Sequence, residues 1–399
     1  MMPHTPVPAD ELSARIDRLR CAMSRRYPDW SMLLLDNKID LYYFTGTMQE
    51  GALVITPGQA VLFVRHSFDC AVKESLFPDI RPMGSFRTIR EAFPDIPPAV
   101  HVAARTMTLQ KLTLLQKHLP FAPQAADDVL SGLRAVKSEY ELSCMRRAGK
   151  LHQTVIEEVA PALLRHGVSE ARLCSEICTF MLDRGAMGIS RYNQPAAEDV
   201  LGIASFSENS LRASALDSPS GNVGTCIAMK SIGSSERCLH EGDIVLLDIP
   251  CGYAGYHTDK TITFYFGELA KHPQGALIRA AREQCVFLEN EIACMLQPGA
   301  VPAEIYEKIL ACVDPAFRSG FMNACKFLGH SIGLTMDETP VLAKGFSAPL
   351  EAGMTIAVEP KIALDGIGLV GCENTYEILP HGPAHSLTGS CDTTMEITS

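Results

Sequence analysis

Five side chains in the last third of the chain have the types and the order of a site that holds metal ions. Four are carboxylates and one is an imidazole: Asp248, Asp259, His330, Glu359 and Glu373. Four ionised carboxylates gathered without cations would cost far more free energy than folding supplies. Two divalent cations would remove that cost, and they would also turn water into a nucleophile near neutral pH. The set therefore predicts a two-metal site that activates water.

The first two acids flank a short turn. An apolar run ends in Asp248, a strand-like run follows Asp259, and the glycine-containing segment CGYAGYH joins them. If the turn is centred between Tyr253 and Ala254, the two aspartates lie directly opposite each other, with Cβ atoms ~4.5–5.5 Å apart. An ordinary surface aspartate is the weaker interpretation of Asp248, because an unpaired charge inside an apolar run is costly.

The last two acids repeat this arrangement. Asp365 and Gly366 predict a turn between two apolar strands, and a short loop there brings Glu359 opposite Glu373. Two hairpins that each present two acids are a more specific signal than four separate acids. A lone His330 would ordinarily be a core histidine. Because it is flanked by glycines and accompanies the acids, it becomes a credible ligand.

The first third of the chain predicts an α/β unit. Residues 10 to 27 have the pattern of an amphipathic helix, and strands are expected at WSMLLLD, LYYFTG, GALVITP, AVLFVR and AVHVAA. A helical stretch at 108 to 118 completes the unit, which the turn-rich segment PFAPQAADD closes. We place the domain boundary near residue 130.

From Leu133 onward, helices gather in runs and strands pair with one another, which is typical of an α+β domain. One long helix has an apolar face formed by Leu142, Met145, Ala148, Val155 and Val159. A second helix is expected to begin at Ser169 as its N-cap and to run to Gly185. Further helices are expected at 274–297 and 302–312, and strands at 243–250, 258–266, 353–363 and 368–379.

Composition excludes several classes of function. The 399 residues are 47% apolar and 20% charged, as in ordinary soluble proteins, and the net charge of -11 without a basic block argues against nucleic-acid binding. No apolar run approaches the ~18 residues of a membrane helix, and the first residues do not resemble a signal peptide.

The fourteen cysteines are scattered, so reduced thiols in the cytoplasm are expected. Cys174 and Cys178 could be half of a metal site, but buried thiols are the preferred interpretation.

The ordered set of Asp, Asp, His, Glu and Glu resembles that of the pita-bread metallopeptidases, which include methionine aminopeptidase, aminopeptidase P, prolidase and the non-metal relative creatinase. GDIVLLDIPCGYAGYHTDKTITF, GHSIGL and VEP are similar to motifs of that family. LRAVKSEYELSCMRRAG resembles the helix that opens its catalytic domain, and NKIDLYYFTG resembles the N-terminal domain of the aminopeptidase P, prolidase and creatinase branch. The resemblance implies a creatinase-type α/β domain at 1–130, a pita-bread α+β domain at 131–399, and a homodimer.

The resemblance also implies roles for the ligands. Asp248 would bind one metal ion, Asp259 and Glu373 would bridge two, and His330 and Glu359 would complete the other site. Glu359 would also be the base for the bridging water, which attacks a metal-polarised carbonyl of a short peptide or dipeptide. Oxygen-rich ligands with one imidazole favour manganese first, with iron, cobalt or zinc as alternatives.

The chain departs from the family at the accessory histidines. Asp337 and Lys326 stand where histidines are expected, and Ser231 falls near the position of a third. Asp337 and Lys326 are therefore further candidate catalytic residues. An aspartate cannot replace a neutral imidazole donor unless its own pKa is raised. Lys326 could polarise or grip a substrate carboxylate, or it could be a solvated surface lysine.

Two further histidines lie near the ligands in sequence. His240 is expected to be exposed in a turn, and His257 could either line the site or pack in the core.

Three functions stay open. The first is a dinuclear hydrolase of the Xaa-Pro peptidase type, and the second is a hydrolase or lyase for a small amide or amidine on the same fold. The third is a binding module without catalysis, against which the intact ligand set argues.

Overall fold

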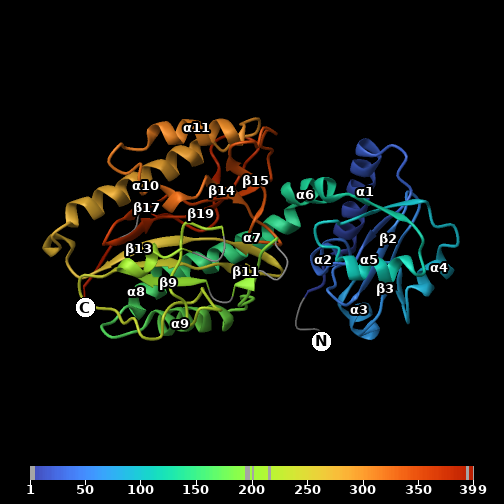
Figure 1. The fold of residues 1–399 in the computed structure, drawn as a ribbon, viewed down its shortest axis with the longest axis horizontal. Helices are drawn as coiled ribbons and strands as arrows, with labels where there is room; N and C mark the ends of the chain where they lie inside the picture. The colour runs from blue at the N-terminus through green and yellow to red at the C-terminus, as the bar shows by residue number, and fades with distance from the viewer. Residues whose placement is uncertain (1–4, 194–197, 200–201, 214–216, 392–394, 399) are drawn as a thin grey trace. The chain divides into compact units, whose positions relative to one another are not determined.

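The computed structural model describes residues 5–193, 198–199, 202–213, 217–391 and 395–398. The chain divides into two compact units, residues 1–134 and 135–399 (Figure 1). Each unit contains both helices and sheet, and we describe each by itself.

The first unit is built on a six-stranded mixed sheet with the order β4-β3-β2-β1-β5-β6. Strand β2 pairs antiparallel with β1 and β3, whereas β5 pairs parallel with β1 and β6. The strands are β1 Leu33–Leu35, β2 Gly51–Ile55, β3 Ala60–Val64, β4 Ile80–Pro82, β5 Ala99–Val102 and β6 Ala122–Ala125. The helices are α1 Ala9–Arg26, α2 Lys38–Thr45, α3 Phe68–Glu74, α4 Arg87–Ala92, α5 Leu109–Gln116 and α6 Asp127–Ala135.

One predicted strand of this unit is wrong. The segment LYYFTG forms the end of helix α2 and its cap. The Asn37 side chain accepts a hydrogen bond from the Asp40 N–H at the start of the helix, and Gly46 ends it with a φ of 73°. These two caps satisfy backbone groups that a helix leaves open, and they outweigh the strand preference of the aromatic residues between them.

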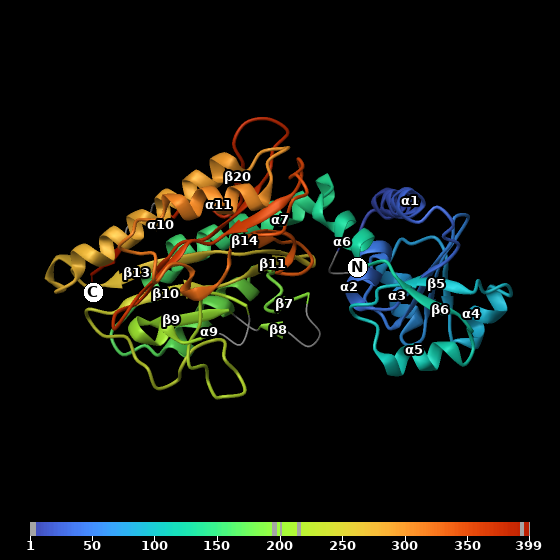
Figure 2. The ribbon, with the colours of Figure 1, turned by 45° about the horizontal axis from the view of Figure 1, so that its top comes forward.

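The second unit places strands between two groups of helices. In Figure 1, α10 and α11 lie on one side of the strands and α8 and α9 on the other, and Figure 2 shows the same sides for α9, α10 and α11. The helices are α7 Glu139–Gln153, α8 Ala160–Leu163, α9 Glu170–Leu182, α10 Gly275–Met295 and α11 Pro302–Cys312, with a π-helical segment at Thr154–Val159. The predicted start of α9 is confirmed, because Ser169 caps that helix, and α7 begins with a capping box formed by Ser138 and Glu141.

Two sheets carry most of the strands of this unit, in the orders β21-β13-β10-β9 and β15-β14-β16-β19-β20, and three two-stranded hairpins join β7 to β8, β11 to β12 and β17 to β18. The first strands are β7 Ser190–Arg191, β8 Glu198–Asp199, β9 Ile203–Phe206, β10 Ile244–Asp248, β11 Cys251–Tyr253, β12 Tyr256–Thr258 and β13 Thr261–Phe266. The remaining strands are β14 Phe327–Ser331, β15 Glu338–Ala343, β16 Thr355–Val358, β17 Lys361–Leu364, β18 Gly368–Gly371, β19 Asn374–Glu377, β20 His385–Ser386 and β21 Glu396–Ile397.

The long strands expected at 353–363 and 368–379 are each interrupted once. β16 gives way to β17 at Glu359 and Pro360, and β18 gives way to β19 at Cys372 and Glu373. Proline has no N–H for a continuous ladder, which accounts for a break at Pro360. The hairpin of β10 to β13 is interrupted in the same way, with Pro250 in its break. The predicted acids therefore lie at or beside the two breaks.

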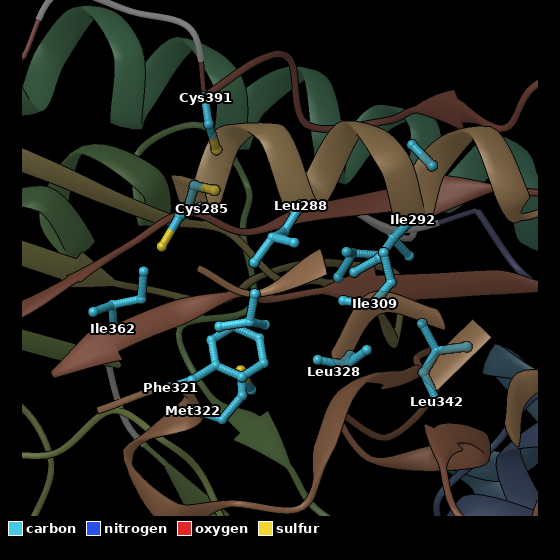
Figure 3. Packing of buried hydrophobic residues seen from close by; sticks show 14 of the residues in the cluster. Cys285, Leu288, Ile292, Ile309, Phe321, Met322, Leu328, Leu342, Ile362 and Cys391 are labelled. Atoms are coloured by element: carbon cyan, nitrogen blue, oxygen red, sulfur yellow. The ribbon is translucent and has the colours of Figure 1, made fainter. Parts of the chain in front are cut away.

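Two hydrophobic cores hold these strands in place. One core packs α10 and α11 against strands β14 to β18, and Figure 3 shows Leu288 and Ile292 of α10 close to Ile309 of α11. The other core packs the segment from Val155 to Met181 against β9, β10 and β13. The hairpins that carry the acids thus lie between two packed layers, which restrict their movement.

Two further observations concern the cysteines and the helices of the described residues. Cys174 and Cys178 are buried in α9, as the preferred interpretation requires, and all fourteen cysteines are thiols. Across the described residues, no helix has the length and apolar character needed to cross a membrane.

Candidate metal centre

Asp248 ends strand β10, and its partner across the hairpin is Thr261 rather than Asp259. The predicted register is wrong by two residues, because the turn is centred on Ala254 and Gly255, whose φ values are 50° and 91°. Two consecutive residues with positive φ match the twist of a two-residue hairpin. Asp259 consequently lies in the break after β12, diagonal to Asp248.

The predicted register of the second hairpin is confirmed. Val358 pairs with Asn374 on one side of the break, and Lys361 pairs with Gly371 on the other side. Both pairings belong to one register, which places Glu359 opposite Glu373. The turn contains Gly366, which has a φ of 69°.

The two hairpins are joined at their breaks. Thr261 and Glu373 exchange both backbone hydrogen bonds, with N–O distances of 3.3 and 3.0 Å. The Thr261 hydroxyl also donates to Glu373 Oε2 at 2.7 Å. On the next pair, the Asp259 N–H donates to Thr375 Oγ1, which in turn donates to the Asp259 carbonyl. These bonds fix Asp259 and Glu373 relative to each other.

His330 approaches the acids from strand β14, where it pairs with Ala357 of β16. Its Nδ1 lies 3.2 Å from the Ser331 carbonyl. Since a carbonyl only accepts, the neutral form of this imidazole has its proton on Nδ1 and its lone pair on Nε2. Nε2 lies 3.5 Å from Glu359 Oε1. The free lone pair of His330 therefore faces the acids, as a metal ligand requires.

Three donor groups surround one position that fits a cation. The ligand atoms of Asp259, His330 and Glu373 lie within 4.8 Å of one another. Glu373 Oε1 is buried and has no hydrogen-bond partner among the described residues. A buried carboxylate oxygen without a partner is costly unless a cation satisfies it. The donor set therefore fits one divalent ion.

The sequence interpretation missed Lys361, which lies among the same acids. Its Nζ is 2.7 Å from Glu359 Oε2, 2.9 Å from Glu373 Oε2 and 3.5 Å from Asp248 Oδ2, and the side chain is fully buried. A signal was present, because residues two apart on a strand share a face, and Lys361 follows Glu359 by two. Its ammonium therefore contacts three of the four predicted acid ligands.

The acids influence one another's protonation. Burial, followed by the charge of Asp248, raises the pKa of Asp259 well above its usual value, and burial with the charge of Asp259 does the same for Glu373. Burial alone would lower the pKa of Lys361. The charges of Asp248, Glu359 and Glu373 outweigh burial and hold the Lys361 pKa well above its usual value. The ammonium therefore compensates part of the negative charge, and the raised pKa values of Asp259 and Glu373 reflect the part that it leaves uncompensated.

Lys326 lies at a cleft beside this centre rather than in it. The cleft has a volume of about 670 Å³ and is lined by Cys325, Lys326 and Phe327 among others. The Phe327 ring lies 6.4 Å, centre to centre, from the His330 ring. Lys326 is exposed. Its position suits a contact with a bound molecule more than a contact with a metal ligand.

Asp337 is half-buried and accepts a hydrogen bond from the Asn193 N–H through Oδ1. Burial raises its pKa, whereas the Asn193 N–H and the charge of His330 act in the opposite direction. An oxygen that accepts a backbone N–H keeps the acceptor character of a carboxylate. Oδ1 is therefore occupied as an acceptor, and the proton that the raised pKa of Asp337 favours would lie on Oδ2.

The other residues that the sequence singled out have structural partners. The buried Ser231 hydroxyl donates to Met229 Sδ at 3.2 Å. His257 is fully buried and packs with Nδ1 3.0 Å from the Gly333 carbonyl, and burial lowers its pKa to about 4. His240 is exposed, as predicted.

Comparison with family models agrees with this arrangement. The model described as the creatinase/prolidase N-terminal domain matches residues 15–136, and that of metallopeptidase family M24 matches residues 143–380. The M24 match contains all five predicted ligands and Lys361.

Individual relatives have peptidase names. A probable dipeptidase, PepE, from Mycobacterium tuberculosis is 28% identical over 276 residues, which are 67% of this chain and 63% of that protein. The chain thus matches less than two thirds of that relative's length. An uncharacterized peptidase from Staphylococcus aureus is 26% identical over 373 residues, or 86% of this chain and 92% of the relative.

A solved structure confirms the predicted fold class. The Xaa-Pro dipeptidase from Bacillus anthracis matches with a TM-score of 0.80 and 21% identity, covering 96% of this chain and 99% of that one. The creatinase-type N-terminal domain and the α+β pita-bread domain are therefore both present. Since the M24 model extends over more than half of the sequence and contains the clustered ligands, the chain belongs to metallopeptidase family M24, in its two-domain creatinase and prolidase branch.

Proposed function

We propose that the protein is a metal-dependent hydrolase that cleaves an amide bond in a dipeptide or short peptide of the Xaa-Pro type. The observation that carries this proposal is the cluster of Asp259, His330 and Glu373, whose donor atoms lie within 4.8 Å of one another. The dipeptidase name of the Mycobacterium tuberculosis relative supports the substrate class. In this proposal, residues 1–130 form the N-terminal domain and residues 131–399 the catalytic domain.

Asp259, His330 and Glu373 would hold the metal ion, with manganese as the first expectation and iron, cobalt or zinc as alternatives. When bound, such an ion polarises a carbonyl and lowers the pKa of water. The original two-metal prediction adds Asp248 and Glu359 as ligands. Lys361 already pairs with both of these acids.

Glu359 is the proposed proton acceptor. Its Oε2 is engaged by Lys361, and its Oε1 lies beside His330, so Oε1 remains to take a proton from water. The water oxygen then bonds to the carbonyl carbon, and the carbon–nitrogen bond breaks. The proton held by Glu359 passes to the leaving nitrogen, so that the products are a carboxylic acid and an amine.

Lys326 is the proposed contact for the substrate's carboxylate. It lies in the cleft wall next to Cys325 and Phe327, and the Phe327 ring contacts the His330 ring. A charge-assisted hydrogen bond of this kind positions the scissile bond and contributes to affinity.

Hydrolysis of a small non-peptide amide is the second candidate. The observation that favours it is Asp337, which accepts the Asn193 N–H where a peptidase of this family would offer a histidine donor. A carboxyl group in place of that imidazole changes how the oxyanion of a peptide bond is stabilised. Peptide and small-amide substrates therefore need to be compared directly.

The test is a hydrolysis assay on manganese-loaded protein with Xaa-Pro dipeptides, short peptide libraries and small amides. The wild-type chain is expected to cleave at least one peptide class, and Asp259→Asn is expected to lose at least ~10²-fold of the activity. Asp365→Asn, at the exposed turn of the second hairpin, is the matched control and is expected to retain activity. Loaded wild-type protein that leaves every peptide intact would contradict the peptidase proposal, and cleavage of amides alone would favour the second candidate.

We also propose a cytoplasmic location and a homodimer. The thiol state of all fourteen cysteines supports the cytoplasmic location. The homodimer rests on the resemblance to the two-domain branch, and light scattering on the purified chain measures the oligomeric state directly.

A further inference from the structure

We propose that the Lys361 ammonium replaces one of the two metal ions of this centre, so that the chain binds a single divalent ion beside a cation of its own. This inference rests on the proposed function for its chemical meaning, but it concerns the metal content of the protein. It departs from the two-metal arrangement that the five ligands predicted.

The contacts of Lys361 are those of a central cation. Nζ lies 2.7 Å from Glu359 Oε2 and 2.9 Å from Glu373 Oε2, with Asp248 Oδ2 at 3.5 Å. An ammonium has three donors, and three carboxylates surround this one. An ion that coordinated the same glutamate oxygens from the same side, at about 2.0–2.2 Å, would overlap with Nζ and would add a repulsive positive charge.

The fold provides space for this lysine. Lys361 is the first residue of β17, and Gly371 is its partner on β18. A Cβ atom at position 371 would lie only 2.4 Å from Lys361 Cγ. Glycine in a strand is typical of a place where another group approaches closely. The lysine stem therefore occupies room that its cross-strand partner leaves open.

The remaining donors define where the single ion binds. Glu373 uses Oε2 for Thr261 and Lys361, and its Oε1 has no hydrogen-bond partner among the described residues. Asp259 and His330 face the same position as Glu373. The four carboxylates, one ammonium and one divalent ion leave the buried centre about one unit negative, and a second divalent ion would make it about one unit positive.

Metal content is the first measurement. Purified full-length protein is dialysed against manganese, and bound metal is determined by mass spectrometry. One ion per chain is expected, together with the electron paramagnetic resonance spectrum of isolated manganese. Two ions per chain, or the spectrum of a spin-coupled pair, would overturn the inference. This measurement needs no variant, so it decides the matter even if a substitution prevents folding.

The variant Lys361→Gly then tests whether the Lys361 ammonium is what excludes a second metal ion. Removing the ammonium and its stem is expected to raise the bound metal from one ion to two per chain. Lys260→Met is the matched control, because Lys260 is equally buried but pairs with Glu157 and Asn374 instead. The control is expected to keep one ion. A folded Lys361→Gly protein that still binds one ion would show that Lys361 does not exclude the second.

The outcomes for metal content and for catalysis are separable. A chain that binds two ions and cleaves peptides would overturn the role of Lys361 and support the proposed function. A chain that binds one ion and cleaves neither peptides nor small amides would support the role of Lys361 and overturn the proposed function.

Discussion

The two glutamates of the centre divide their oxygens in the same way. Lys361 engages Oε2 of both Glu359 and Glu373, which leaves Oε1 of Glu359 beside His330 and Oε1 of Glu373 without a hydrogen-bond partner among the described residues. A buried lysine in this position stabilises the acids electrostatically before any metal binds. Its removal would leave a buried charge without compensation, which is one of the more destabilising changes in a protein.

Lys361→Met is therefore expected to lower the free energy of unfolding of metal-free protein by about 3–5 kcal/mol. Urea unfolding in the presence of a chelator measures this loss. Added manganese is expected to recover more stability in the variant than it adds to the wild type, because it supplies the missing positive charge. Equal stability of the two metal-free proteins would contradict the electrostatic role of the lysine.

His152 gives the second unit a dependence on pH. It is fully buried and hydrogen-bonded to Thr258 Oγ1, and burial followed by the charge of Lys260 lowers its pKa to about 3. In the unfolded chain, His152 binds a proton near pH 6.5. The contribution of the neutral His152 to the free energy of unfolding is therefore fully present above that pH, and it decreases as the pH falls toward 3. At pH 5, His152 alone is expected to lower the free energy of unfolding by about 2 kcal/mol relative to neutral pH.

His152→Gln is expected to reduce the loss of stability between pH 7 and pH 5, because glutamine does not titrate. Urea unfolding of both proteins at the two pH values provides the comparison. Identical acid sensitivity in variant and wild type would show that another group dominates.

At the scale of elements, the centre depends on two hairpins that are interrupted where they carry their acids. Each break interrupts backbone pairing, and Thr261 and Glu373 then restore it between the hairpins. Close packing across β17 and β18 is part of the same construction, since Gly371 makes room for Lys361.

Gly371→Ala is expected to cost about 1–3 kcal/mol of stability, because its methyl group would displace the lysine stem. In a Lys361→Gly background the same change is expected to cost less, so that a double-mutant cycle shows coupling between the two positions. Additive effects in thermal or urea unfolding would argue against direct packing of the pair.

The sequence predicts helix starts and turns correctly where local chemistry determines them. Its predictions fail where a feature depends on residues that only the tertiary structure brings together. Ser169 and the turn at Gly366 were identifiable because caps and positive φ values have local signatures. The register of Asp248 was wrong because two neighbouring turn positions were compatible with the same glycines. Lys361 was missed because a strand lysine ordinarily faces solvent, and only the fold brings three acids to it.

At the scale of the molecule, the second unit contains the whole candidate centre and two cores of its own. Both cores are formed by residues from Ala135 onward, whereas Met32 to Phe121 form a core of the first unit. The two cores beside the metal-binding residues are therefore formed within the second unit.

A fragment of residues 127–399, which keeps α6 intact, is accordingly expected to fold and to bind metal with the same stoichiometry as the full chain. Circular dichroism on heating and metal analysis of the fragment test this, with the full chain as control. A fragment that is folded but unable to hold the ion would show that the first unit completes the centre.

The lysine within the centre has a consequence for how the protein responds to its metal supply. A centre that needs two ions loads through two binding equilibria, so at low supply its working fraction falls with the square of the free metal concentration. With Lys361 encoded in the chain, a single equilibrium remains, and the working fraction falls only in proportion to that concentration. Such a protein would retain more of its activity than a two-ion relative of equal affinity when the metal becomes scarce.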